Sequence, residues 1–175
     1  MKLAKVALVI AMGLAGISAA NAATQGQGNG TVTFHGYIID APCSISGDTI
    51  DQTVELGQVA SAQLENQGSS TPVPFQIDLQ DCAVDAGTVQ VTFNGVANAV
   101  DTTMLGLNGT AAGAGIVITD GSDSQLDLGT ASAGQKLNEG DNTLQFAAYL
   151  KGESASATIT PGEFQSVANF ALAYN

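Results

Sequence analysis

Apolar and polar residues alternate along much of the chain, most clearly at its C-terminal end. Ala168, Phe170, Leu172 and Tyr174 share one parity, and small or polar residues occupy the positions between them. A period of two over several residues is typical of a β-strand with one buried face. Because chain ends usually fray unless they are tied down, we expect this strand to be held in a sheet.

Other segments show the same alternation or are short apolar runs. They are 31–36, 51–56, 75–82, 89–93, 115–119 and 142–151. Asn94-Gly95 and Asp120-Gly121 follow two of these runs and favour tight turns. The pattern predicts roughly eight to ten short strands and no helix-period stretch after the N-terminal leader. It favours an all-β Greek-key sandwich of immunoglobulin-like type, although the chain has no Trp to fill the core as in antibody domains.

The first residues have the pattern of an export signal. A start with two lysines precedes an apolar run from Val6 to Ile17 that is too short to span a bilayer. Ala20 and Ala22 are small residues at the positions that a signal peptidase recognises. We therefore predict a signal peptide at 1–22, cleaved between Ala22 and Ala23. No later segment approaches about 18 continuous apolar residues, so no membrane anchor is expected.

The mature chain, 23–175, is strongly acidic. The signal peptide carries two of the four lysines and none of the sixteen acidic residues, so its removal changes the formal charge from −12 to −14. The chain contains no Arg, and Lys136 and Lys151 are its only remaining cations. Nucleic-acid binding needs clustered Lys or Arg to neutralise phosphates, so that class of function is excluded.

The two cysteines and the single histidine limit the possible chemistry. Cys43 and Cys82 lie 39 positions apart, and an even cysteine count in an exported chain predicts one structural disulfide. Their spacing is far from a redox Cys-x-x-Cys, and His35 alone cannot complete a metal site. The acidic residues are scattered through turns and solvent faces. We therefore expect neither an enzyme nor a cofactor or metal site.

Several stretches, in this order and spacing, resemble the major-subunit pilins of chaperone–usher fimbriae, the type 1 and P pilus rod family. They are Gly30 to Gly36, Asp40 to Ile45, Gln52 to Val59, Phe75 to Cys82, Gly162 near the C-terminus, and the final strand with its penultimate Tyr174. The resemblance covers essentially the whole mature chain. It implies an immunoglobulin-like sandwich that lacks its seventh strand, so that the last strand borders an open groove.

The same resemblance implies how the groove is filled. A periplasmic chaperone first lends it a strand, and at the outer-membrane usher the N-terminal arm of the next subunit replaces that strand, which is donor-strand exchange. The donor face on this sequence would be Gly28, Gly30, Val32, Phe34 and Gly36. The chaperone-facing groove edge would be Gly162, Phe164, Phe170, Leu172 and Tyr174.

These observations predict a signal peptide at 1–22, a donor-strand arm at 23–36 and a pilin domain at 37–175. The expected function is structural: a fimbrial subunit, exported through the periplasm, that polymerises with identical or related pilins into a surface pilus supporting adhesion and biofilm formation. The alternatives are a minor adaptor or terminator subunit, and a secreted single-domain adhesive module. A two-domain adhesin would need about twice this length.

Overall fold

The computed structural model describes residues 30–83 and 85–175, and the chain divides into two units, Met1–Ile38 and Ile39–Asn175. The predicted cleavage site at Ala22 and Ala23 and the first predicted donor residue, Gly28, lie outside the described residues. In the first unit, residues 30–38 form neither helix nor strand, and their side chains are exposed.

The second unit is built from strands of two to thirteen residues, and its helices are no longer than four residues. Its elements are β1 (Ser44–Ile45), α1 (Gly47–Ile50), α2 (Ser61–Leu64), η1 (Glu65–Gln67), β2 (Val73–Cys82), β3 (Thr88–Gly95), β4 (Leu105–Gly106), β5 (Asn108–Gly109), β6 (Ala114–Asp120), β7 (Gln125–Leu126), β8 (Gln135–Lys136), β9 (Gly140–Gly152), β10 (Phe164–Gln165) and β11 (Ala168–Tyr174). The predicted strands at 75–82, 89–93, 115–119, 142–151 and 168–174 are all present, as β2, β3, β6, β9 and β11.

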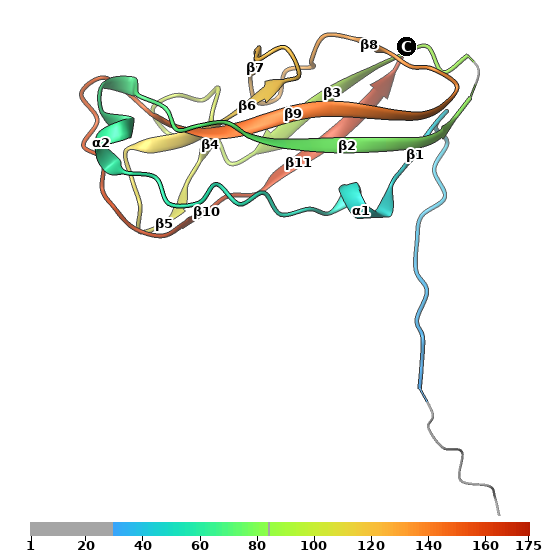
Figure 1. Ribbon diagram of the computed structural model, residues 1–175, viewed down its shortest axis with the longest axis horizontal. Helices are drawn as coiled ribbons and strands as arrows, with labels where there is room; N and C mark the ends of the chain where they lie inside the picture. The colour runs from blue at the N-terminus through green and yellow to red at the C-terminus, as the bar shows by residue number, and fades with distance from the viewer. Residues whose placement is uncertain (1–29, 84) are drawn as a thin grey trace, which may run out of the picture. The chain divides into compact units, whose positions relative to one another are not determined.

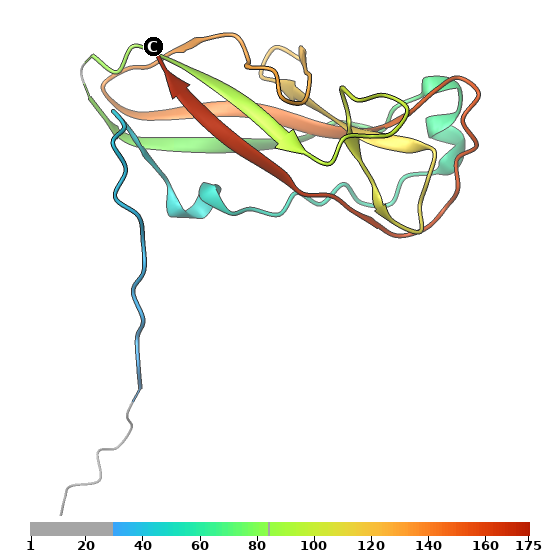
Figure 2. The same cartoon turned by 180° about the vertical axis from the view of Figure 1, so that it is seen from behind.

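The strands form two facing layers (Figures 1 and 2). A six-stranded sheet has the order β1-β2-β9-β6-β4, with β7 also paired to β6. A three-stranded sheet has the order β11-β3-β8, and β10 pairs with β5 in a third, two-stranded ladder. Every ladder in the part of the chain that the structure describes is antiparallel. The expected all-β sandwich is confirmed.

An aromatic cluster joins the two layers. Phe75 on β2 and Phe146 on β9 stack with their ring centroids 5.5 Å apart. Phe93 on β3 meets Phe146 edge-on at 5.2 Å and Phe75 at 6.1 Å. Aromatic pairs of this geometry add stabilisation beyond the area that they bury, so these three rings hold one sheet against the other.

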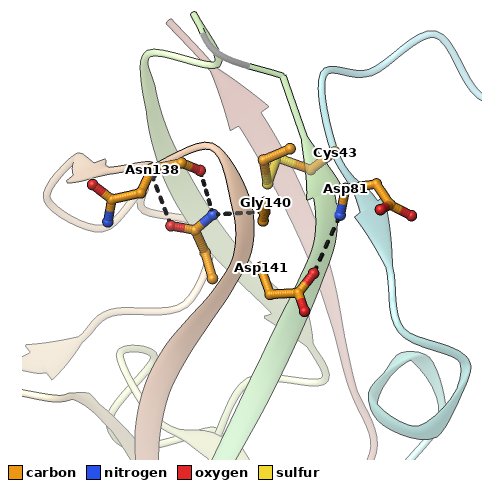
Figure 3. Close-up of a disulfide and its surroundings, with 7 residues drawn as sticks. Cys43, Asp81, Asn138, Gly140 and Asp141 are labelled. Carbon is orange, nitrogen blue, oxygen red and sulfur yellow. Dashed lines mark hydrogen bonds between the residues drawn. A yellow bond between two sulfur atoms is a disulfide. The ribbon is translucent and has the colours of Figure 1, made fainter.

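The predicted disulfide joins Cys43, just before β1, to Cys82 at the end of β2 (Figure 3). The β2–β9 register shifts between Leu79 and Cys82, and Asp81 in that interval has a positive φ of 51°. Its amide N–H donates to an Asp141 carboxylate oxygen at 3.4 Å. The disulfide therefore ties the segment before β1 to the end of β2 at a β-bulge, where the regular β2–β9 ladder is interrupted.

The alternating segments 31–36 and 51–56 are not strands, contrary to the expectation from their pattern. Both pair with no other described segment. Alternation reports which side of a strand would be buried, but a strand also needs a neighbour with free backbone groups. For both segments such a neighbour is missing among the described residues of this chain.

Candidate strand-binding groove

A groove of about 1470 Å³ runs along the second unit between the segment 51–59 and the C-terminal strand region. Side chains from both sheets form its floor. They include Phe75, Phe93, Ile116, Ile118, Ala148 and Leu150. Leu64 of α2 and Ile159 line it as well. The floor is therefore apolar, and it is continuous with the hydrophobic core.

β11 forms one wall of the groove and has an unpaired edge. It pairs with β3 on one side only (Figure 2). Thr88 and Asn175 exchange two backbone hydrogen bonds of 2.9 Å, which makes them a hydrogen-bonded pair. Since such pairs alternate with non-hydrogen-bonded pairs along an antiparallel ladder, the N–H and C=O groups of Phe170, Leu172 and Tyr174 point away from β3.

Contacts on the far side of β3 confirm this assignment. The Val91 carbonyl accepts from the Ser132 amide at 2.9 Å, and the Phe93 carbonyl accepts from the Gly129 amide at 2.8 Å. These residues lie opposite Leu172 and Phe170, so their backbone groups are also turned away from the β3–β11 ladder. The free edge of β11 is therefore a row of regularly spaced donors and acceptors.

The opposite wall, 51–59, is a second unpaired edge. Val54, Leu56 and Val59 are half-buried, and the residues between them are exposed. The Gln52 side-chain amide fastens the start of the wall by donating to the Gln76 carbonyl at 2.9 Å. From 53 to 59, the backbone makes no hydrogen bond to the described chain. The groove thus lies between two edges that can each accept a further strand.

Gly162 and Phe164 are brought to the groove by a close crossing of two chain segments. A Cβ atom at Gly162 would lie 2.6 Å from the amide nitrogen of Ala111 and would also clash with the Thr110 hydroxyl. The Glu163 carbonyl accepts from the amides of Thr110 and Ala111, at 2.9 and 3.1 Å. Only a glycine allows this approach, which holds the loop before β10 against Thr110 and Ala111, just after β5.

The five predicted edge residues do not all line the groove. Gly162, Phe164 and Phe170 do, whereas Leu172 and Tyr174 do not. Leu172 and Tyr174 are half-buried on the same face of β11 as Phe170, and like Phe164 and Phe170 they pack against the core cluster. The Tyr174 hydroxyl is buried with no hydrogen-bond partner among the described residues, and burial raises the pKa of that phenol.

The predicted donor residues that the structure describes are Gly30, Val32, Phe34 and Gly36, and all of them are exposed. Phe34 is 89% exposed, an unusual state for a large aromatic side chain. Ile38 is fully exposed and has the same parity, so it extends this apolar face beyond Gly36. Sequence reasoning missed Ile38, although its spacing from Val32 and Phe34 gave the signal.

The groove suits a peptide strand better than a small molecule or a metal ion. Residues 30–83 and 85–175 contain no group of three His, Cys, Asp or Glu side chains that could hold a metal. Within the same ranges no helix is long and apolar enough to cross a membrane. Two free backbone edges above an apolar floor provide hydrogen bonds along a strand and space for alternate side chains, as in β-strand addition.

The comparisons with known proteins agree with this geometry. The family described as "Fimbrial protein" matches residues 32–175. The chain is 51% identical to the fimbria A protein of Serratia marcescens and 49% identical to the major MR/P fimbria protein of Proteus mirabilis, in each case over 99% of both chains. A subunit from a chaperone–usher pilus structure superposes with a TM-score of 0.76 at 34% identity, covering 85% of this chain and 97% of that one. The P pilus rod subunit gives 0.69 at 32% identity, covering 77% of this chain and 100% of that one. The chain therefore belongs to the fimbrial protein family.

Proposed function

We propose that this protein is the major subunit of a chaperone–usher fimbria and that it polymerises by donor-strand exchange. The arm of one subunit, 23–36 and its continuation to Ile38, fills the groove of the next. The observation that carries this proposal is the pair of unpaired backbone edges, 51–59 and β11, on either side of an apolar groove. The protein is a structural subunit at the cell surface and not an enzyme.

The arm supplies the two things that the open groove lacks, which are apolar side chains to cover its floor and a backbone to pair with its free edge. Transfer of Val32 and Phe34 from water into the groove stabilises the contact by about 1.5–3 kcal/mol for each side chain. Backbone pairing along the free edge of β11 adds about 0.5–1.5 kcal/mol for each hydrogen bond. Gly30 and Gly36 let the strand lie close to the groove floor where no side chain is needed.

This mode of contact produces a filament. The arm and the groove are different surfaces, so each subunit donates to one neighbour and accepts from another. Such a head-to-tail contact does not close on itself and gives an open rod. No cofactor or covalent bond between subunits takes part, because apolar burial and strand pairing hold the rod together.

Assembly requires that the groove is covered before a neighbour arrives. An unpaired edge beside an apolar groove pairs readily with other chains and leads to aggregation. A periplasmic chaperone lends a strand to Gly162, Phe164 and the β11 edge after residues 1–22 are removed on export. The outer-membrane usher is then the site where the arm replaces that strand.

The test is a set of arm variants expressed together with the chaperone and usher. Deleting 23–36 should leave a subunit that is recovered with its chaperone but forms no fimbriae. Phe34→Asp should do the same, because it places a charge in the groove, whereas Thr33→Asp on the opposite face of the arm should still assemble. Fimbriae counted by electron microscopy from the deletion variant would overturn the proposal.

A further inference from the structure

All charged side chains that line the groove are acidic. They are Asp51 and Glu55 on one wall and Glu163 beside the other. Neither lysine of the mature chain, Lys136 or Lys151, is among the lining residues that the structure describes. The remaining outward positions of β11, Asn169, Ala171 and Ala173, are uncharged. An occupant of the groove therefore meets negative charge along its rim.

The arm carries one side chain that can complement this charge. Residues 30–38 contain no Lys, Arg, Asp or Glu, and His35 is the only histidine of the chain. Tyr37 is the only other titratable residue in this segment, and the nearest acidic residue along the chain is Asp40. When Phe34 and Gly36 face the groove, His35 faces outward, because neighbouring residues of a strand point to opposite sides.

The direction of the inserted arm follows from the directions of the two walls. β11 runs from β10 back toward the disulfide end, and 51–59 runs from α1 toward α2, which is the opposite direction (Figure 1). All described ladders of this protein are antiparallel, and antiparallel pairing is the slightly more stable form. An arm antiparallel to β11 is parallel to 51–59.

Glu55 is the only charged residue of 53–59, the part of the wall whose backbone makes no hydrogen bond to the described chain. Val54 and Leu56 face inward, as Phe34 and Gly36 do, so His35 and Glu55 both face outward. The exposed carboxylate of Glu55 is therefore the charge that an outward-facing His35 meets on this stretch of the wall.

We propose that His35 of one subunit forms an ion pair with Glu55 of the next, and that its protonation tightens strand donation. This inference rests on the proposed function. Asp51 and Glu163 add attraction from the same rim, and no Lys or Arg among the described lining residues opposes it. The groove thereby favours a second copy of this chain with a protonated arm.

The sign of the pH dependence follows from this pair. An ordinary histidine titrates near pH ~6.5, and the subunit contact stabilises its charged form. The added stability is therefore present at about pH 5.5 and is lost as the pH rises through neutrality. Carboxylates remain ionised over this window, because they titrate near pH ~4. An exposed ion pair of this kind corresponds to about a two- to fivefold effect on dissociation.

The test uses isolated fimbriae of the full-length protein in a fixed concentration of denaturant. The rate at which monomers dissociate is measured at pH 5.5 and pH 7.5 for wild type, H35Q, E55Q and the control E139Q, whose exposed carboxylate does not line the groove. Wild type and E139Q should dissociate about two- to fivefold more slowly at pH 5.5 than H35Q or E55Q does. At pH 7.5 the four should differ little.

A charge exchange gives a second measurement that does not depend on pH. H35E should dissociate faster than wild type, and H35E combined with E55K should recover the wild-type rate. The inference is overturned if H35Q shows the same pH ratio as wild type, or if E55K does not rescue H35E. Either result would leave donor-strand exchange standing, since that proposal is tested separately by the arm deletion.

Discussion

Phe170 on β11 lies directly opposite Phe93 on β3, and their ring centroids are 6.5 Å apart. Phe93 is 4% exposed and belongs to the aromatic cluster between the sheets, whereas Phe170 is half-buried and lines the groove. The strand that borders the groove is therefore joined to the core by an aromatic pair. The groove wall and the sandwich core are parts of one packed structure.

Phe170→Ala should destabilise the isolated subunit by about 2 kcal/mol, less than a fully buried phenylalanine, because part of the ring is already exposed. Phe93→Ala should cost about 3–5 kcal/mol. Asn169→Ala, on the exposed face of the same strand, should change stability by less than about 0.5 kcal/mol. The free energy of unfolding in urea measures all three. Equal losses for Phe170→Ala and Asn169→Ala would contradict this account of the wall.

Gly162→Ala should destabilise the subunit by about 1–3 kcal/mol, because the added methyl overlaps the backbone of Ala111 and cannot be accommodated without moving it. Gly47→Ala is the matched control, since a Cβ atom there meets nothing within 4 Å. The control should be neutral or slightly stabilising. Thermal unfolding monitored by circular dichroism distinguishes the two, and an unchanged midpoint for Gly162→Ala would refute the close crossing.

Removing the disulfide through Cys43→Ser with Cys82→Ser should cost about 4 kcal/mol on the chain-entropy model for a loop of this length. Reduction of the wild-type protein should produce a similar loss, which separates the effect of the bond from that of the serines. Urea unfolding with and without reductant provides the measurement. A loss below about 1 kcal/mol in both cases would show that the bridge contributes little.

Asp101 should make the folding stability of the protein depend on pH in the acid range. Its carboxylate accepts from the Thr103 hydroxyl at 2.6 Å and from the Thr103 amide at 3.1 Å, and these bonds lower the pKa of Asp101. A lowered pKa means that the contribution is complete above about pH 4, the ordinary aspartate value, and is lost as the pH falls further.

Thr103→Val removes the hydroxyl and should raise the pKa of Asp101 toward its ordinary value. The variant should be less stable than wild type near neutral pH, and the difference should shrink below about pH 4. Titration of the Asp101 carboxyl by NMR, together with urea unfolding at several pH values, measures both effects. A stability difference that grows as the pH falls would be inconsistent with a lowered pKa for the Asp101 carboxyl in the folded protein.

The sequence predicted the parts of the fold that depend on local pattern. The alternation of Phe170, Leu172 and Tyr174 indicated a half-buried strand, and the cysteine count predicted the Cys43–Cys82 bridge. The pattern could not show which of these side chains line the groove, because that depends on how segments far apart in the sequence pack together. It also could not show the approach of Gly162 to Ala111, which joins segments far apart in the sequence.

The segment 51–59 illustrates a second limit of sequence reasoning. Val54 and Leu56 alternate with exposed residues as a strand would, yet the segment pairs with nothing in the described chain. Under the proposed donor-strand exchange, the neighbour of this strand comes from another molecule. Val32 and Phe34 form an apolar face on the arm in the same way. Both side chains are exposed in the described part of the first unit.

Photocrosslinking in intact fimbriae tests the contact between arm and groove most directly. A benzophenone amino acid replaces Phe34, fimbriae are assembled and irradiated, and cross-linked peptides are identified by mass spectrometry. The account predicts covalent dimers and larger ladders in which position 34 is joined to groove residues of a neighbouring subunit, such as Phe93, Ile118 or Phe170. Cross-links confined to a single subunit, or joined to surfaces away from the groove, would contradict it.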